Sequence, residues 1–484
     1  MEAFLHPLQG LAEFGEIKKR CGANCGILNV SGCMESQKVH LMYGLSGLFP
    51  YHLILADDER NAKEIYEDYR FYDKNVYFYP AKDLLFFQAD IHGNLLIRQR
   101  MRVIRALLEQ EEVTVVTSID GCMDFLMPLE KIRSRLLHFK SDSVIDLDQL
   151  KEELVELGYE RTGQVELPGQ FSVRGGIIDI YPLTEDNPWR IELWDDEVDS
   201  IRSFDAESQR SLENVDEITI YPAAEKMDGE DMVSFLDYFP EEKTLVFLDE
   251  LNHLAENGEG VEEEYRQSRM HREEKGEANL PEQWLCGFQE LQKKLNRRNC
   301  VAVSALSPRR SGWKINGEFD LTVKSVDSYN SSFELLVKDL LQYKSQGYRI
   351  ALLSGSRTRA ERLAKDLSEE GLNAFYSQDM DRIISPGEIM VVYGHARRGF
   401  QYPLIKFAVM TETDIFGKEQ KKRKKKKKYS GNRIQDFAEL SIGDLVVHEK
   451  HGLGIYRGIE KVEVDRVVKD YIKIEYRGGS NLYI

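Results

Sequence analysis

The run over residues 169–182, GQFSVRGGIIDIYP, restricts the possible fold more than any other part of the chain. Its apolar residues alternate with small and polar residues, as they do in a half-buried β-strand. Gly175 and Gly176 interrupt the alternation and permit a bulge or a sharp bend. After the turn signal Asn187-Pro188, residues 189–211 continue with further short runs of the same kind. These patterns predict a β-meander within a β-rich domain.

The composition is that of a globular protein with room for several domains. Of its 484 residues, 42% are hydrophobic and 31% are charged. No apolar run of about 18 residues occurs, and the first residues lack the basic start and apolar core of a signal peptide. Six cysteines are scattered without the spacing of a zinc site. We therefore expect a cytoplasmic protein with free thiols, no bound metal and no membrane span.

The charge distribution argues against broad binding to nucleic acids. With 65 basic and 83 acidic residues, the chain has a net charge of −18, and an acidic surface repels phosphate groups. The exception is residues 421–428, where eight basic residues follow one another. Such a block is usually a solvated tether, although it can attract DNA or RNA phosphates nonspecifically. We expect the tether.

Residues 25–39 have the order of a phosphate-binding loop: a short buried strand, a glycine turn and a helix. Gly32 and Lys38 match the G-x-x-x-x-G-K-[ST] pattern, but Gln37 replaces its second glycine. Gln37 has a Cβ where the loop needs positive φ. Val39 stands at the Ser or Thr position and has no hydroxyl group for magnesium. We therefore predict a relict loop that does not hydrolyse ATP and binds no cofactor.

A second candidate for nucleotide chemistry follows the strand predicted over residues 244–248. Asp249 and Glu250 begin a box that would read D-E-x-H in a working helicase, but Asn252 stands at the histidine position and His253 comes one place late. The box is either a second relict or an ordinary solvated cap at the end of a strand. The solvated cap is our default expectation.

The remaining segments alternate between two kinds of pattern. Before residue 120, and again over 325–417, strands alternate with amphipathic helices, which predicts parallel α/β sheets. From residue 441, short strands with glycine turns predict a small β-barrel. We expect this barrel to be incomplete, because residue 484 falls inside a predicted strand.

The meander, with FDAESQRSLENVDEITIYPA following it, resembles the second domain of the UvrB-like module. That module is shared by the excision-repair protein UvrB and the transcription-repair coupling factors of the Mfd family. The degenerate phosphate loop and the TETDIFG run before the basic linker are also similar to the Mfd family. Residues 443–484 resemble the RNA polymerase-interacting domain of that family, so the resemblance covers essentially the whole chain and corresponds to the N-terminal portion of a family member.

The resemblance implies an α/β multidomain fold: a degenerate helicase-like parallel sheet with a β-rich insert, a second small α/β domain and a partial Tudor-like β-barrel. The expected segments are UvrB-like domain 1a with an N-terminal helix (1–120), UvrB-like domain 2, which binds UvrA (121–205), UvrB-like domain 1b (206–324), a small α/β domain (325–417), a basic linker (418–440) and an incomplete polymerase-interacting domain (441–484).

The resemblance also implies a site for the repair protein UvrA. Arg161, Phe171 and Arg174 are the positions that carry over, since guanidinium groups pair with carboxylates and an aromatic ring can anchor an interface. Ser172 departs from the F-R-V-R-G motif of UvrB, whose first arginine it replaces. The alternative for Arg174 is a role in the glycine bend alone.

A second implied site contacts the RNA polymerase β subunit. We expect it at an exposed strand edge near Lys461, Val462 and Glu463, through addition of a β-strand. The alternative is that Val462 faces the barrel core.

Together these features imply a binding platform in transcription-coupled nucleotide excision repair. It would recruit UvrA to RNA polymerase stalled at damaged DNA, while ATP and magnesium would serve a C-terminal translocase outside this chain that releases the polymerase. Two alternatives remain: a stand-alone UvrB-like protein that binds nucleotide, and a nucleic-acid-binding protein that works through residues 421–428.

Overall fold

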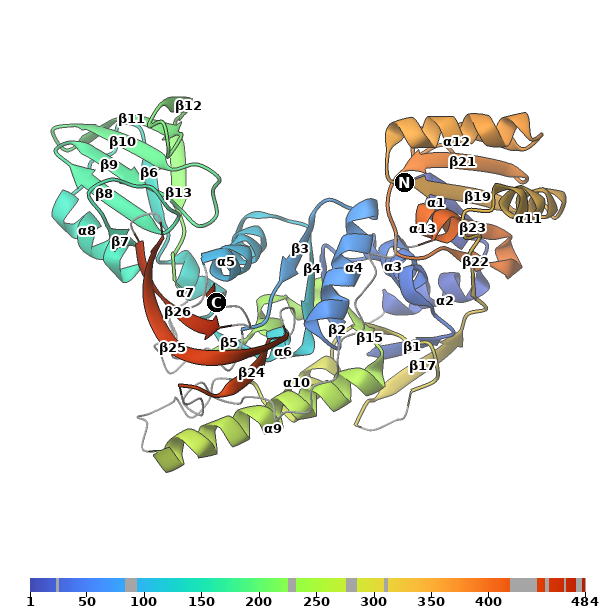
Figure 1. Ribbon diagram of the computed structural model, residues 1–484, viewed down its shortest axis with the longest axis horizontal. Helices are drawn as coiled ribbons and strands as arrows, with labels where there is room; N and C mark the ends of the chain where they lie inside the picture. Colours follow the sequence, from blue (N-terminus) through green and yellow to red (C-terminus); the bar gives the residue numbers. More distant parts are fainter. Residues whose placement is uncertain are drawn as a thin grey trace. The chain divides into compact units, whose positions relative to one another are not determined.

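The computed structural model describes residues 1–22, 26–82, 94–224, 232–275, 285–308, 312–417, 442–448, 452–464, 467–475 and 481–483 (Figure 1). The chain forms two compact units. The larger contains most residues up to 419, and the smaller contains residues 82–93, 263–280 and 420–484. No helix in the described part of the chain is long and apolar enough to cross a membrane. The basic linker lies outside the described residues.

The larger unit is built around a seven-stranded sheet in the order β17-β1-β16-β15-β2-β4-β3. Every pairing in it is parallel, as predicted. Its strands are β1 (Ile27–Ser31), β2 (Tyr51–Ala56), β3 (Val76–Tyr79), β4 (Val113–Ser118), β15 (Thr244–Asp249), β16 (Cys300–Val303) and β17 (Ile315–Asp320). Several of these strands are buried along their whole length, which explains why each has apolar residues at consecutive positions.

Helices precede β1 or connect the strands that follow it. They are α1 (Glu2–Leu8), α2 (Ala12–Cys21), α3 (Glu35–Ser46), α4 (Glu59–Tyr72), α5 (Asn94–Glu109), α9 (Leu251–Lys275) and α10 (Phe288–Leu295). The expected N-terminal helix is present as two helices, α1 and α2. The carboxylate of Asp58 caps α4 by accepting a hydrogen bond from the Asn61 amide at 2.6 Å. The apolar residues of α5 pack inward, as expected for the amphipathic helices of this region.

A β-rich insert follows β4. Its six-stranded sheet has the order β12-β11-β10-β9-β8-β7, and helix α8 (Leu147–Glu156) precedes it. Its strands are β7 (Glu160–Arg161), β8 (Gln170–Arg174), β9 (Ile177–Ile180), β10 (Trp189–Trp194), β11 (Glu197–Phe204) and β12 (Ser211–Val215). Strands β8 to β12 pair antiparallel in sequence order, so the predicted meander is present. Gly175, with a φ of 59°, lies in the turn between β8 and β9.

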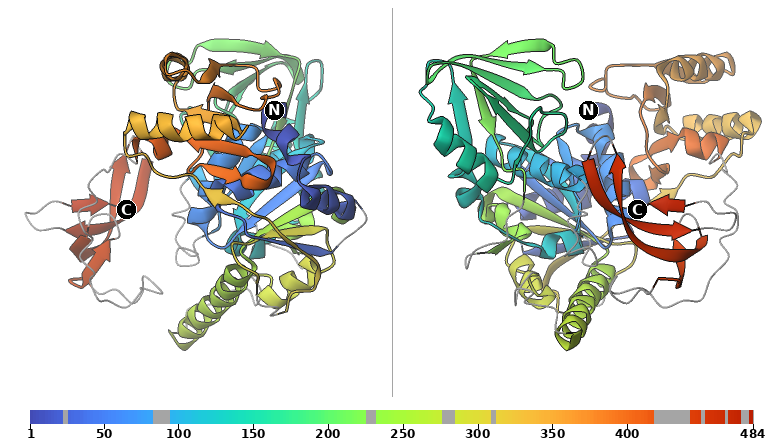
Figure 2. Two further views of the ribbon diagram at one scale, coloured as in Figure 1. Left: turned by 90° about the vertical axis from the view of Figure 1, so that its right-hand side faces the viewer. Right: turned by 60° about the vertical axis from the view of Figure 1, so that its left-hand side comes forward.

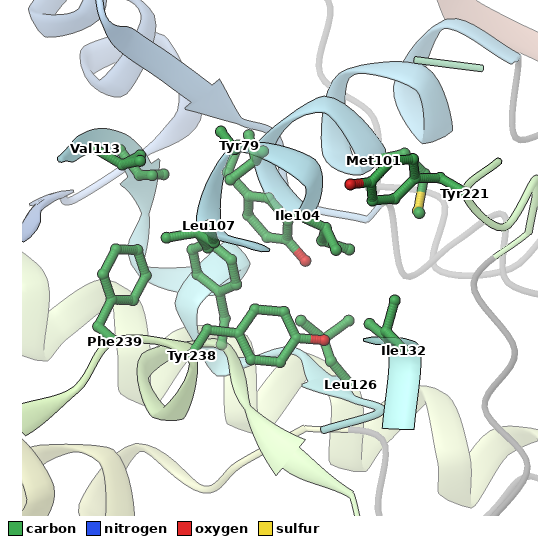
Figure 3. Packing of buried hydrophobic residues seen from close by; sticks show 14 of the residues in the cluster. Tyr79, Met101, Ile104, Leu107, Val113, Leu126, Ile132, Tyr221, Tyr238 and Phe239 are labelled. Atoms are coloured by element: carbon green, nitrogen blue, oxygen red, sulfur yellow. The ribbon is translucent and has the colours of Figure 1, made fainter. Parts of the chain in front are cut away.

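One hydrophobic core joins the insert to the parallel sheet. Figure 3 shows Met101, Ile104 and Leu107 of α5 beside Tyr79 and Tyr221. The same cluster continues to the inner face of the insert, where Phe171, Ile178 and Ile191 are fully buried. At the edge of this core, Arg98 and Arg102 of α5 pair with Asp186 of the β9–β10 loop at 2.6 and 2.7 Å.

The second α/β region has a sheet of its own, in the order β18-β22-β23-β19-β21-β20. Its elements are β18 (Lys324–Ser325), α11 (Phe333–Ser345), β19 (Arg349–Ser354), α12 (Arg357–Glu369), β20 (Asn373–Tyr376), β21 (Glu388–Tyr393), β22 (Phe400–Tyr402), β23 (Phe407–Thr411) and α13 (Glu412–Phe416). Four strands pair in parallel, whereas β22 joins them antiparallel.

The smaller unit contains an antiparallel sheet in the order β24-β25-β26-β27. Its strands are β24 (Leu445–His448), β25 (Gly452–Val464), β26 (Val467–Glu475) and β27 (Asn481–Tyr483). Figure 2 shows β25 and β26 as long, curved strands.

Candidate functional site

The glycine turn after β1 is shaped by the chain around it. Gly32 has a φ of 76°, a conformation that residues with a Cβ rarely adopt. A Cβ at this position would also overlap the carbonyl oxygen of Leu321. The Leu321 amide donates a hydrogen bond to the carbonyl oxygen of Ser31 at 2.9 Å, so β17 holds the turn in place. Gly32 is therefore required here by close packing of the backbone.

Lys38 forms a buried ion-pair cluster with the acidic box. Its Nζ atom lies 2.6 Å from Asp249 Oδ1 and 2.6 Å from Glu250 Oε1. The side chain of Lys38 is only 11% exposed and that of Asp249 only 4%. Asn61 adds a hydrogen bond from its Nδ2 atom to Asp249 Oδ2 at 2.7 Å, and the Ala305 amide donates one to Glu250 at 2.8 Å.

This cluster corrects the default expectation for the acidic box. Asp249 and Glu250 do not form a solvated cap, because the parallel order of the sheet brings the carboxyl end of β15 and the start of α3 to the same edge. Burial acts to lower the pKa of Lys38, but the charges of Asp249 and Glu250 outweigh it and raise that pKa above its ordinary value.

Gln37 has polar contacts that reach the second α/β region. Its Nε2 atom donates a hydrogen bond to the hydroxyl oxygen of Tyr402 at 2.9 Å, and its Oε1 atom accepts one from the Met34 amide at 3.0 Å. The Arg398 amide donates to Ser36 Oγ at 3.2 Å. Residues 398–402 thus cover the first turn of α3, where the amide groups of a working phosphate loop would face a ligand.

The turn and the first part of α3 are consequently occupied by protein groups. The ammonium group of Lys38 is neutralised, Gln37 is fully buried and Val39 is buried without a polar atom. Among the described residues, no group of three or more His, Cys, Asp or Glu side chains could hold a metal ion. The arrangement can stabilise the packing of two sheets against each other.

The outer face of the insert carries a network of charged groups. Arg174 Nη2 lies 2.7 Å from Asp179 Oδ2, and Arg190 contacts the same carboxylate through Nε at 2.7 Å and Nη2 at 2.9 Å. Asp179 is buried, whereas the side chain of Arg174 remains 45% exposed. Arg190 also lies 4.3 Å from the centre of the Phe204 ring. The guanidinium group of Arg174 is therefore held in place and open to solvent.

The other two positions expected to contact UvrA lie elsewhere on the sheet. Phe171 is fully buried in the core of the insert, so its side chain is not accessible to a partner. Arg161 is exposed on the edge strand β7 and pairs with Phe171 in register. Because side chains alternate between faces along a strand, Arg161 and Arg174 project from opposite faces.

The positions expected to contact the polymerase lie in the second half of β25. Their backbones pair with β26, with Lys461 opposite Asp470, Val462 opposite Lys469 and Glu463 opposite Val468; their side chains lie outside the described residues. Strand β24 pairs only with residues 452–455 of β25. Beyond residue 455, the edge of β25 that pairs with β24 has no partner among the described strands. Nearby, Ile459 is 57% exposed.

Sequence reasoning missed four residues of these sites: Asn61, Asp179, Arg190 and Tyr402. Asp179 and Arg190 carried a usable signal, because they are the polar members of otherwise apolar alternating strands. Tyr402 carried none, because its contact with Gln37 spans 365 residues of sequence.

The fold and two matched domains define the class, a multidomain α/β protein with a UvrB-type insert. A family model described as the UvrB interaction domain matches residues 137–225, which contain the six-stranded sheet. A second, described as the CarD-like/TRCF RID domain, matches residues 440–484.

Comparison with curated proteins then identifies the relatives. The chain is 29% identical over 529 residues to the transcription-repair-coupling factor of Bacillus subtilis (strain 168), a match that covers 94% of this chain and 45% of the relative. The factor of Staphylococcus epidermidis (strain ATCC 12228 / FDA PCI 1200) is 28% identical, with 89% and 42% covered. That of Staphylococcus aureus (strain MRSA252) is 26% identical, with 85% and 40% covered. The resemblance to the N-terminal portion of these factors is confirmed, and the chain spans less than half of their length.

Proposed function

We propose that this chain is the platform that recruits UvrA to an RNA polymerase stalled at a DNA lesion, in transcription-coupled nucleotide excision repair. One observation carries the proposal: a single chain contains both a UvrB interaction domain and a CarD-like/TRCF RID domain. A protein with both can bridge two large partners without chemistry of its own. The names of the relatives support the same role.

UvrA is the proposed partner of the insert. Arg174 supports this, since its guanidinium group is held by Asp179 and still exposed, a geometry suited to pairing with a carboxylate of the partner. Arg161 offers a second cation at the sheet edge. The contribution of Phe171 is to pack the strand that carries Arg174.

The polymerase β subunit is the proposed partner of the smaller unit, which we take as part of a Tudor-like barrel. Strand β25 pairs with β26 along one edge. Its opposite edge, which pairs with β24, has no partner strand beyond residue 455 among the described residues, and this supports the proposal. An edge of this kind can accept a strand from another protein.

For the central sheet we propose a degenerate helicase-like domain that neither binds nor hydrolyses ATP. The contacts of Lys38 with Asp249 and Glu250 support this, because a phosphate ligand would have to displace two carboxylates. ATP and magnesium would then serve a translocase in the longer relatives, which would release the polymerase. The relatives do not favour a stand-alone nucleotide- or nucleic-acid-binding function, and the cluster argues against nucleotide binding.

A bridging experiment tests the platform. Immobilised polymerase β subunit is incubated with the chain and then with purified UvrA; we expect UvrA to be retained only when the chain is present. A chain lacking residues 441–484 should no longer retain UvrA on the immobilised subunit but should still bind UvrA directly. That result assigns the two partners to separate surfaces. Failure of the intact chain to bind either protein refutes the proposal.

A further inference from the structure

The hairpin of β10 and β11 leaves a large aromatic ring in solvent. Trp194 is the last residue of β10 and pairs with Glu197, the first residue of β11. It is 80% exposed. A tryptophan side chain offers a large apolar surface, and in folded proteins most of that surface is buried on average. Because tryptophan is enriched at interfaces and among the residues that dominate binding energy, an exposed tryptophan is a candidate contact residue.

The local sequence explains why nothing in the sheet covers the ring. Side chains alternate along β10, so Ile191 and Leu193 face the core while Trp194 faces the opposite side. The Leu193 amide donates a hydrogen bond to the carbonyl oxygen of Gly176 at 2.7 Å, which places Trp194 beside the Gly175-Gly176 turn. These two residues have no side chains that could fold over the indole.

A second exposed apolar residue, Val144, lies on the same face of the sheet, with Glu197 between it and Trp194. Val144 forms an antiparallel bridge with Glu197, so Val144, Glu197 and Trp194 form a row across three neighbouring backbones. Residues directly opposite each other project from the same face. Val144 is 70% exposed.

Charged groups stand on the same face of the sheet as Trp194, because Arg174 lies opposite Ile177 and Ile177 lies opposite Glu192. Arg174 ends β8 immediately before the two glycines, and its guanidinium group is fixed by Asp179. On the same face of β10, Glu192 accepts a hydrogen bond from Arg202 Nη1 at 2.9 Å. Protein interfaces commonly combine an aromatic anchor with charged residues on the same surface.

We infer that Trp194 is the anchor of the surface through which the insert binds UvrA, with Val144 and Arg174 on the same face of the sheet. The inference rests on the function proposed above and adds the residue that dominates the contact. The complementary surface of UvrA offers an apolar depression for the indole with a carboxylate at its edge for Arg174.

Binding of purified UvrA to the full chain tests this inference. Trp194→Ala should weaken binding by about 30-fold or more, the effect typical of an interface hot spot, and Trp194→Phe should weaken it less. Leu212→Ala is the matched control, because Leu212 is an apolar residue of β12 in the same sheet with 57% exposure. We expect it to change the affinity by less than about twofold. Since Trp194 is exposed, the variants should unfold at the same urea concentration as the parent chain.

The outcomes distinguish a failure of the inference about Trp194 from a failure of the proposed function. If the parent chain binds UvrA and Trp194→Ala binds equally well, Trp194 is not the anchor and the inference is wrong, while the proposed function stands. If the parent chain does not bind UvrA at all, the proposed function fails and the inference fails with it. If Leu212→Ala weakens binding as much as Trp194→Ala, the contact is centred elsewhere on the sheet and the inference is again wrong.

Discussion

The ion-pair cluster at Lys38 yields the sharpest prediction about stability. Lys38→Met removes the ammonium group and leaves Asp249 and Glu250 close together without a cation. Removing one partner of a buried ion pair costs about 3–5 kcal/mol. Because Asn61 and the Ala305 amide still donate to the two carboxylates, we expect the lower end of that range, about 3 kcal/mol.

Urea denaturation measures this effect. With a slope of about 2–3 kcal/mol per molar urea for the transition of the larger unit, the midpoint should fall by about 1–1.5 M. Lys63→Met is the matched control, because Lys63 pairs with Glu59 on the exposed face of α4. Its cost should be below about 1 kcal/mol.

The same variant has a defined pH dependence. The pKa of Lys38 is raised in the folded chain, so the stabilisation is fully present below the unfolded pKa of about 10.4 and is lost as pH rises through the folded value. The gap between parent and Lys38→Met should therefore be constant at neutral pH and shrink above about pH 10.4. If Lys38→Met is as mild as Lys63→Met at pH 7, the lysine is not held by the cluster, and it would be available for a phosphate ligand.

Three further predictions concern the packing of the larger unit. Burial lowers the pKa of His40 to about 4. The free energy of unfolding should therefore fall by up to about 3 kcal/mol as the pH drops from about 6.5 to 4. Urea titrations at several pH values should show a smaller fall for His40→Gln. Gly32→Ala should lower the free energy of unfolding by about 2 kcal/mol or more, because φ is positive and the Cβ would overlap Leu321, whereas Gly15→Ala, with open space at its Cβ, should not. Phe171→Ala should destabilise the chain by about 3–5 kcal/mol in the same assay, and a change within about 1 kcal/mol would refute its place in the core.

These predictions separate stability from recognition. The Phe171 and Arg174 positions were expected to serve one contact, yet one is in the core and the other is on the surface. A loss of UvrA binding in Phe171→Ala would therefore reflect a damaged sheet, whereas a loss in Arg174→Ala with unchanged stability would report on the contact itself.

The sequence by itself determined most local structure. Alternation and apolar runs predicted the strands and helices that alternate before residue 120, among them β2 and α4, and the turn signals predicted the meander. The departures at Gln37 and Val39 were also visible in the chain, because a phosphate loop is one continuous segment whose chemistry depends on adjacent residues.

Only the tertiary structure decided what the polar side chains do. Lys38 and Asp249 are 211 residues apart, and they meet because parallel strands place their carboxyl ends at one edge of the sheet. The faces of Arg161 and Arg174, and the exposure of Trp194, depend on register and on which strand is the neighbour. Periodicity reports which side of one element is apolar, but the order of strands in a sheet is set by contacts between distant segments, and no local pattern contains that order.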